Sequence, residues 1–265
     1  MSAASDAPRP DAPRGRADLH IHTLASDGVS GVADILDHAE RAALDVIAIT
    51  DHERLDAALA ARSMAEARGS RVQVIVGEEV TTRGGHVLGL YLTERVKPWG
   101  SLRTTIAQIH EQGGLAIIAH PLVPYPLCVS ARSIRSLLSE QDAIFHPDAI
   151  EAFNATTARL PGAARVPAFA EEVGLPVIGA SDAHRAEDVG HALTTFPGRS
   201  ADDVRAALEA GTTAWAGKPH KWGRQVDMFV RQQRKNARAV GANTRRRLFG
   251  AGLGRDLGYP RESRP

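Results

Sequence analysis

The stretch Asp18-Leu19-His20-Ile21-His22 lies in the first segment of the chain that predicts a β-strand. Alternate side chains of a strand face the same side, so Asp18, His20 and His22 are expected to converge. Two imidazoles about 6 to 7 Å apart can bind one transition-metal ion, and a neighbouring carboxylate can orient a ring or join the coordination. The stretch therefore predicts a metal site, although a polar strand end with surface histidines fits it too.

Apolar strands then alternate with amphipathic helices, which predicts a parallel α/β architecture. The predicted strands are 17–23, 46–50, 72–76, 115–119, 149–153, 177–180 and 212–216, with an added strand at 86–92. The predicted helices are 32–43, 55–68, 102–112, 133–138, 167–173 and 201–210. Polar residues recur at the C-terminal ends of most strands, which favours a closed or nearly closed barrel. The chain has no Gly-x-Gly-x-x-Gly or Walker pattern, so a dinucleotide or P-loop enzyme is not expected.

The composition limits the class of protein and the residue types that can bind a metal ion. Its 265 residues, 43% of them apolar, can hold one large α/β domain or two small ones. Residues 1–16 predict a disordered leader, and no apolar run has the length of a membrane span or a signal peptide, so a cytoplasmic protein without membrane contact is expected. The single cysteine, Cys128, excludes an internal disulfide and a multi-cysteine zinc site. Metal ligands must therefore come from His, Asp and Glu.

Charge is distributed unevenly along the chain. Residues 217–265 hold thirteen Lys or Arg and three Asp or Glu, whereas the rest of the chain is acidic. We expect a barrel over 17–217 and a basic, partly helical extension over 218–265. Trp222 and Phe229 interleave with basic residues, which suits RNA or DNA contact. Their spacing of seven residues equally suits a helix face packed on the barrel.

Metal-type side chains follow the other predicted strands as well. These side chains are Asp51 and His52, Glu78 and Glu79, His120, Asn154, and Asp182 and His184. Such residues at consecutive strand ends predict a metal cluster. Asp27 in the first loop fits a ligand or a turn residue, and His86 at the start of the added strand fits a ligand or a structural residue. Glu78 and Glu79 point to opposite sides of an extended strand, so only one is expected to bridge ions.

Taken together, these motifs resemble one protein family. They are Asp18-Leu19-His20-Ile21-His22-Thr23, Ser26-Asp27-Gly28, Ile49-Thr50-Asp51-His52, Gly77-Glu78-Glu79-Val80, Ala119-His120-Pro121 and Ala180-Ser181-Asp182-Ala183-His184. Their order is similar to that of the polymerase and histidinol phosphatase (PHP) superfamily of metal-dependent phosphoesterases. The resemblance implies a distorted (β/α)7 barrel with two or three divalent ions, Mn, Zn or Fe, with Mg possible.

The resemblance also assigns residues to the ions. It implies His20, His22, Glu79 and Asp182 around one ion, Glu79 and His120 around a second, and Asp27, His52, His86 and His184 around a third. Asn154 stands where some members carry another histidine, so we expect it to be a weak ligand or a neighbour of the ligands. Asp18 is expected in an orienting role.

The expected activity is hydrolysis of a phosphomonoester or phosphodiester by a hydroxide held between ions. His52 or His184 would protonate the leaving alkoxide, and Arg132 and Arg185 are candidate phosphate anchors. Because some relatives act on nucleotide 3′-phosphates or RNA ends, a nucleotide or short oligonucleotide is favoured over a small molecule of the histidinol phosphate kind. The alternatives are an amide or lactone hydrolase of the amidohydrolase type and a metal-stabilised barrel that serves a nucleic-acid assembly without catalysis.

Overall fold

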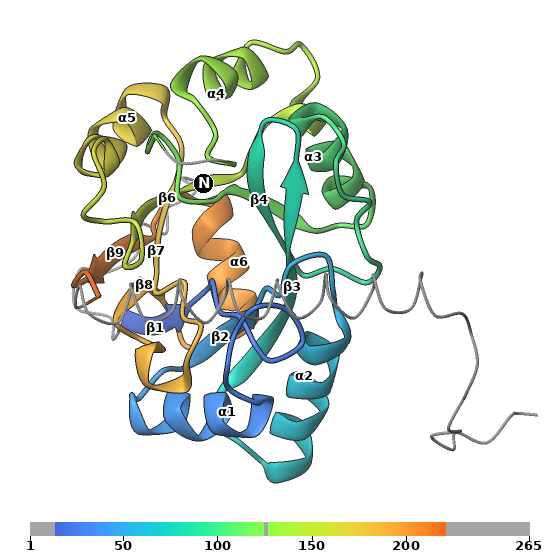
Figure 1. Cartoon of the computed structure of the whole chain (residues 1–265), viewed down its shortest axis with the longest axis vertical. Coiled ribbons are helices and arrows are strands. Elements are labelled where there is room, and N and C mark those ends of the chain that lie inside the picture. Colours follow the sequence, from blue (N-terminus) through green and yellow to red (C-terminus); the bar gives the residue numbers. More distant parts are fainter. Residues whose placement is uncertain (1–13, 125–126, 221–265) are drawn as a thin grey trace, which may run out of the picture. The chain divides into compact units, whose positions relative to one another are not determined.

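A single curved sheet dominates the computed structural model, which describes residues 14–124 and 127–220. Within these residues the sheet has nine strands in the order β7-β6-β5-β4-β3-β2-β1-β8-β9 (Figure 1). The strands are β1 (Arg14–Asp18), β2 (Val46–Ile49), β3 (Gln73–Thr82), β4 (Gly85–Leu90), β5 (Leu115–Ile118), β6 (Ala149–Asn154), β7 (Val177–Ala180), β8 (Ala192–Pro197) and β9 (Ala214–Gly217). The expected distorted α/β barrel is confirmed.

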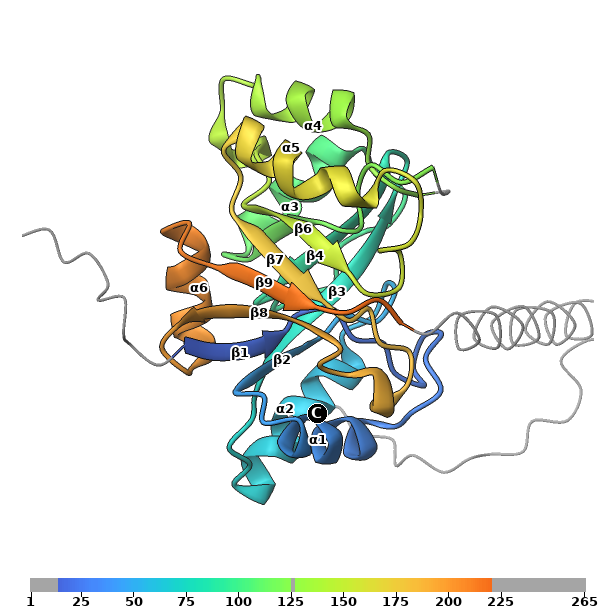
Figure 2. The ribbon, with the colours of Figure 1, turned by 90° about the vertical axis from the view of Figure 1, so that its left-hand side faces the viewer.

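β7, at one edge of the sheet, meets β8, the strand next to the other edge, without a backbone ladder among the described residues. The hydroxyl of Thr194 on β8 donates to the carbonyl of Gly179 on β7 at 2.9 Å and accepts from the Gly179 N–H at 3.1 Å. Figure 2 shows β7, β8 and β9 side by side at this point. The barrel is therefore nearly closed, with a side chain supplying the bridge between β7 and β8.

Six α-helices cover the described part of the sheet, and all six predicted helices are found with ends within two residues of the prediction. They are α1 (Val32–Arg41), α2 (Asp56–Arg68), α3 (Leu102–Glu111), α4 (Ala131–Leu138), α5 (Val166–Val173) and α6 (Ala201–Glu209), with 3₁₀ turns η1 (Ala143–Phe145), η2 (Ala163–Arg165) and η3 (Ala186–Asp188). Ser200 and Asp203 form a capping box that starts α6. None of the described helices is long and apolar enough to cross a membrane.

Helix α6 packs inside the curve of the sheet. Its side chains Val204, Ala207 and Leu208 share one buried apolar cluster with residues of the strands, among them Val46 and Ile117. A second cluster lies between the sheet and the outer helices. Apolar packing thus fills the body of the barrel, and the carboxyl ends of the strands are left to polar side chains.

Three strand predictions were wrong in detail. β1 begins at Arg14 and ends at Asp18, so residues 14–16 belong to the sheet, and His20 and His22 follow the strand rather than lie in it. β3 runs on to Thr82, which places Glu79 inside a strand that continues as a hairpin with β4. β8 was not predicted; it pairs antiparallel with both β1 and β9. Apart from 218–220, the predicted helical extension lies outside the described residues.

Candidate metal centre

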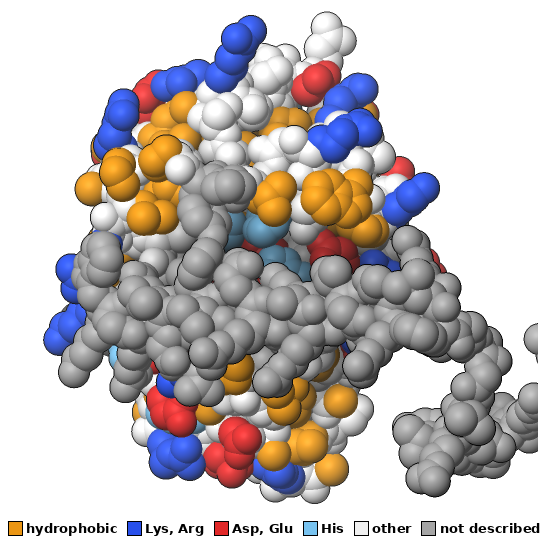
Figure 3. Space-filling view, in the orientation of Figure 1, with side chains coloured by type: hydrophobic (Ala, Val, Ile, Leu, Met, Phe, Trp, Pro, Cys, Tyr) orange, Lys and Arg blue, Asp and Glu red, His pale blue; other side chains and the backbone are white. Residues whose placement is uncertain are grey.

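The nine residues predicted as metal ligands lie together at the carboxyl ends of the strands. They are His20, His22, Asp27, His52, Glu79, His86, His120, Asp182 and His184, and each has a ring nitrogen or carboxylate oxygen within 3.6 Å of another member. Figure 3 shows histidine and acidic side chains in a hollow on this face. His52 has the most exposed side chain of the nine, at 25%. We call this group the Glu79 cluster.

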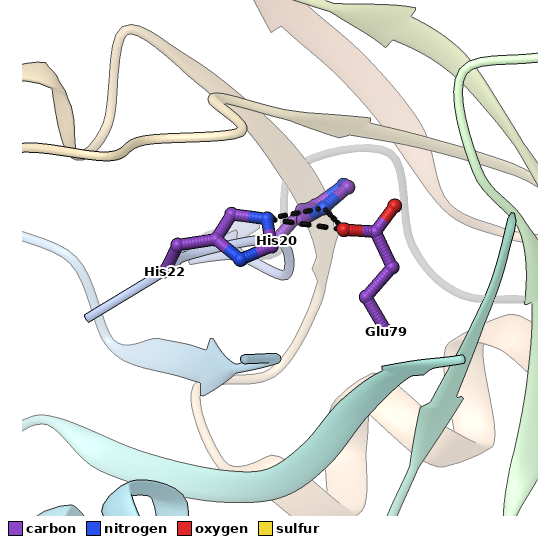
Figure 4. A group of neighbouring side chains, drawn as sticks. All are labelled: His20, His22 and Glu79. Carbon is purple, nitrogen blue, oxygen red and sulfur yellow. Dashed lines mark hydrogen bonds and ion pairs between the residues drawn. The ribbon is translucent and has the colours of Figure 1, made fainter. Parts of the chain in front are cut away.

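Glu79 stands between two pairs of histidines. Its Oε2 lies 3.2 Å from Nε2 of His20 and 3.1 Å from Nε2 of His22 (Figure 4). Its Oε1 lies 2.7 Å from Nδ1 of His86 and 3.0 Å from Nε2 of His120. The hairpin of β3 and β4 produces this arrangement because it carries both Glu79 and His86. One carboxylate therefore offers each of its oxygens to a different pair of imidazoles.

Asp27 gathers a second set of histidines on the other side of His22. Its carboxylate oxygens lie 3.4 Å from Nδ1 of His22, 3.6 Å from Nε2 of His52 and 3.1 Å from Nε2 of His184. The loop that carries Asp27 is held by Asp51, whose carboxylate accepts hydrogen bonds from the backbone and hydroxyl groups of Thr23 and Ser26. Asp51 thus fixes Asp27 against the strand ends.

Asp182 is the third carboxylate of the Glu79 cluster. Its Oδ1 lies 3.6 Å from Nε2 of His20, 3.3 Å from Nε2 of His22 and 3.6 Å from Nδ1 of His184. His86, expected in the group of Asp27, His52 and His184, lies on the hairpin next to Glu79. Its ring neighbours both that of His52, with centroids 5.1 Å apart, and that of His120, with centroids 5.4 Å apart.

The donor atoms fit divalent cations. Among the described residues, Nδ1 of His22 and Nδ1 of His86 are buried without a hydrogen-bond partner, although Asp27 and Glu79 carboxylate oxygens lie 3.4 and 2.7 Å away. Buried polar atoms are normally satisfied, so these lone pairs point to a cation as their partner. Imidazole and carboxylate are the ligands of zinc, iron and manganese sites.

Electrostatics in the cluster couple histidines to carboxylates. Burial lowers the pKa of His20, but Asp182 and Glu79 outweigh it and hold that pKa well above its usual value. Burial likewise raises the pKa of Glu79, but His86 and other rings outweigh it and hold that pKa well below its usual value. His22 and His120 also have raised pKa values, against the lowering effect of burial. Protons therefore compete with cations for these ring nitrogens.

Glu151 on β6 is a site residue that the sequence analysis missed. Its Oε1 lies 3.1 Å from Nδ1 of His20, and its Oε2 accepts a hydrogen bond of 2.6 Å from the backbone N–H of His120. It is 1% exposed. A carboxylate on one ring nitrogen fixes the orientation of the imidazole and leaves the other nitrogen for a metal. Its only sequence signal was a charged residue inside a buried strand, three positions before Asn154.

Asn154 does not offer its oxygen to the cluster. Its Oδ1 accepts hydrogen bonds from the backbone N–H groups of Thr156 and Thr157, at 3.0 and 2.9 Å. Its Nδ2 donates to Glu151 Oε2 at 3.0 Å and to Asp182 Oδ2 at 3.2 Å. The two backbone donors fix which end of the amide is the oxygen. Of the two roles expected for Asn154, these hydrogen bonds favour that of a neighbour of the ligands, because its amide orients two carboxylates.

Asp18 orients the loop after β7. Its Oδ1 accepts from the backbone N–H of Ser181 at 3.0 Å and its Oδ2 from that of Gly190 at 2.8 Å. Burial raises the pKa of Asp18 to about 6, against the lowering effect of these hydrogen bonds. Asp18 thus holds the segment that carries Asp182 and His184. Asp182 has a positive φ of 52° in this segment.

The two predicted phosphate anchors lie in different surroundings. Arg132 is an exposed residue of α4. Arg185 is half-buried and directly follows His184. Arg185 thus lies next to a member of the Glu79 cluster along the chain, whereas Arg132 projects from a helix surface.

Nine metal-type side chains, seven of them buried and two partly buried, gather at the strand ends of an α/β barrel and define a candidate metal-binding fold. A family model described as the PHP domain matches residues 18–133, and a second, described as PHP-associated, matches residues 164–213. The uncharacterized protein MJ1587 of Methanocaldococcus jannaschii is 34% identical over 151 residues, which are 53% of this chain and 82% of that protein. The chain belongs to the PHP superfamily.

Two further similarities concern activity and fold. The phosphoribosyl 1,2-cyclic phosphate 1,2-diphosphodiesterase of Eggerthella lenta is 35% identical over 83 residues, which are 29% of this chain and 31% of that enzyme. A solved two-domain protein from Bacteroides vulgatus, described as containing a predicted PHP-like metal-dependent phosphoesterase, superposes with a TM-score of 0.63 at 21% identity. The superposition covers 82% of this chain and 70% of that protein, and it supports the fold.

Proposed function

We propose that this protein hydrolyses a phosphomonoester or phosphodiester with two or three divalent ions bound in the Glu79 cluster. The observation that carries the proposal is the division of Glu79, whose Oε2 faces His20 and His22 while its Oε1 faces His86 and His120. A carboxylate shared in this way can hold two cations close together despite their repulsion. The phosphodiesterase of Eggerthella lenta is a relative with this kind of chemistry.

The bound ions would bind phosphate oxygens, neutralise their charge and lower the pKa of water. The protein's own contribution is to hold the ligand atoms rigidly: Glu151 orients His20, Asp18 fixes the loop of Asp182, and Asp51 fixes the loop of Asp27. Such preorganisation spares the reaction the cost of arranging charges around the phosphate.

His52 is the best placed proton donor for the leaving group. Its side chain is 25% exposed, whereas that of His184 is 7% exposed. Burial lowers the pKa of His52, but Glu79 outweighs it and raises that pKa above its usual value. A raised pKa favours the protonated ring, and a histidine open to the hollow can protonate an alkoxide when it is not fully engaged as a ligand, so we assign this role to His52 ahead of His184.

A pocket beside the cluster supports a nucleotide as the substrate. The pocket has a volume of about 310 Å³, and its lining includes His120 and Glu151 of the site as well as Phe153, Pro167 and Trp215. The rings of Phe153 and Trp215 are stacked, with centroids 4.9 Å apart and an interplanar angle of 6°. An apolar pocket with ring faces next to a phosphate site suits a base or sugar ring.

The basic extension is proposed to contact an oligonucleotide. Its Lys and Arg residues lie outside the described part of the chain, so the proposal depends on their charge alone. Deleting residues 236–265 should raise the KM for short RNA and leave the KM for mononucleotides unchanged. An unchanged KM for RNA would exclude the deleted residues as its docking site.

The proposed activity is tested with a substrate panel. Metal-free protein is loaded with manganese, iron or zinc and assayed on nucleoside monophosphates, nucleoside bisphosphates, short RNAs, histidinol phosphate, sugar phosphates, amides and lactones. We expect hydrolysis of phosphate esters, highest on nucleotides, and no hydrolysis by His22→Ala. Hydrolysis of amides or lactones alone would assign an amidohydrolase-type activity, and failure on the whole panel would overturn the proposal.

A further inference from the structure

A second group of metal-type side chains includes one from the loop that Asp18 holds. Asp188 ends η3, His191 precedes β8, and His220 follows β9. One ligand atom from each of these three residues lies within 4.8 Å of the others. None of the three belongs to the Glu79 cluster, and we call them the Asp188 triad.

Backbone carbonyls fix the tautomers of both histidines. Nε2 of His220 lies 2.9 Å from the carbonyl oxygen of Ser181, and Nδ1 of His191 lies 2.9 Å from that of Asp188. A carbonyl oxygen only accepts, so these two ring nitrogens carry the protons. The lone pairs of the neutral rings therefore lie on Nδ1 of His220 and on Nε2 of His191.

The lone pair of His220 has no hydrogen-bond donor in the described part of the chain. Its Nδ1 is buried and unpartnered, and the residue is 4% exposed. An unsatisfied buried nitrogen is unfavourable, and a cation at this point would offset that cost.

We propose that Asp188, His191 and His220 bind a divalent transition-metal ion, Zn²⁺ being the best match. Two imidazoles and one carboxylate form a ligand set that zinc accepts, and a carbonyl bond on one nitrogen of a ring is the arrangement that orients histidine ligands. His191 is exposed, so an ion bound there would be accessible to solvent and could exchange. The ion would link His220, in the segment after β9, to Asp188 in η3. Because His220 also contacts the carbonyl of Ser181, the ion would in addition stabilise the chain next to Asp182.

The test counts zinc ions on the full-length protein. Metal-free wild type, His191→Ala and the control His146→Ala are titrated with ZnCl₂, and bound zinc is measured by elemental analysis after desalting. His146 is a suitable control because its Nε2 donates to the carbonyl of Glu140, away from the triad. We expect His191→Ala to bind one ion fewer per chain than wild type and His146→Ala to match wild type.

Two further readouts separate ligand loss from misfolding. Asp188→Asn keeps the size of a buried side chain and should weaken the corresponding zinc site at least tenfold, while the Tm in chelator stays that of wild type. His191→Ala should retain the phosphate-ester hydrolysis of the manganese-loaded protein, because it leaves the Glu79 cluster intact. Equal zinc content and affinity in wild type, His191→Ala and Asp188→Asn would overturn the proposed site.

Discussion

Oε1 of Glu151 lies 3.1 Å from Nδ1 of His20, and this contact turns Nε2 of the same ring toward Glu79 and His22. The carboxylate is almost fully buried, so its charge acts on His20 with little screening by water. The geometry of the proposed metal centre therefore depends on a residue that is not one of its expected ligands.

Replacing Glu151 tests this dependence. Glu151→Gln keeps the size of the side chain but removes the charge that holds His20, so the Kd for manganese should rise about 10- to 100-fold. Calorimetric titration of metal-free protein measures it. Glu172→Gln, on the surface of α5, is the matched control. A Glu151→Gln variant with the wild-type Kd would show that His20 needs no orienting carboxylate.

Asp18→Asn should act on stability before it acts on catalysis. The amide keeps one acceptor for the N–H groups of Ser181 and Gly190 and turns a donor toward the other, at a cost of about 1–3 kcal/mol in the free energy of unfolding. Displacement of Asp182 should also lower hydrolysis about tenfold without abolishing it. Urea unfolding and kcat measure the two effects, and Asp37→Asn on the surface of α1 is the control. Complete loss of activity in a folded Asp18→Asn protein would make Asp18 part of the reacting centre.

Glu78 gives the stability of the protein a defined dependence on pH. Burial raises its pKa from 4.5 to about 7, against the lowering effect of the Val96 N–H bond. The native state thus holds a proton that the unfolded chain releases near pH 4.5, so this contribution to stability falls as the pH rises from about 4.5 to about 7. Glu78→Gln should remove the decline and stabilise the metal-saturated protein at pH 8, by about 1–2 kcal/mol.

Thermal unfolding of wild type and Glu78→Gln between pH 5 and pH 8 checks this sign. Glu94→Gln, an exposed neighbour on the following loop, should follow the wild-type curve. If the difference in Tm between Glu78→Gln and wild type stayed constant across this range, Glu78 would not be the group that titrates.

Metal affinity should rise with pH. His20, His22 and His120 have pKa values above the usual value for histidine, because nearby carboxylates outweigh burial. In the metal-free protein these rings hold protons that a cation must displace, so the affinity should increase about tenfold per pH unit for each proton displaced. Zinc titrations at pH 6, 7 and 8 measure the slope. An affinity independent of pH would mean that the rings are already neutral.

Much of the architecture follows from sequence periodicity, since all six α-helices were predicted within two residues of their ends. The nine predicted ligands also converge, because side chains that follow neighbouring strands meet at one edge of a barrel. β8 was missed although Thr194, Thr195 and Phe196 favour a strand and Gly190 and Gly198 flank it. A regular α/β alternation does not predict a strand that follows β7 without an intervening α-helix.

The remaining site geometry depends on backbone irregularities that a sequence does not reveal. On β6 the register shifts between Glu151 and Phe153, so Glu151 and Asn154 contact each other although an ideal strand would send them to opposite faces. His120, the second residue after β5, adopts a positive φ of 28°. These departures decided the roles of Glu151 and Asn154, which spacing alone could not assign.

The most direct test of the proposed centre is the hydrolysis rate of Glu79→Gln. The change keeps the size of the side chain but removes the charge that faces both histidine pairs, so with manganese and the best substrate of the panel kcat should fall at least about 100-fold. Loss of a residue that only orients a metal ligand already lowers metal affinity or activity about 10- to 100-fold. Glu79→Gln that folds and hydrolyses at the wild-type rate would contradict the account.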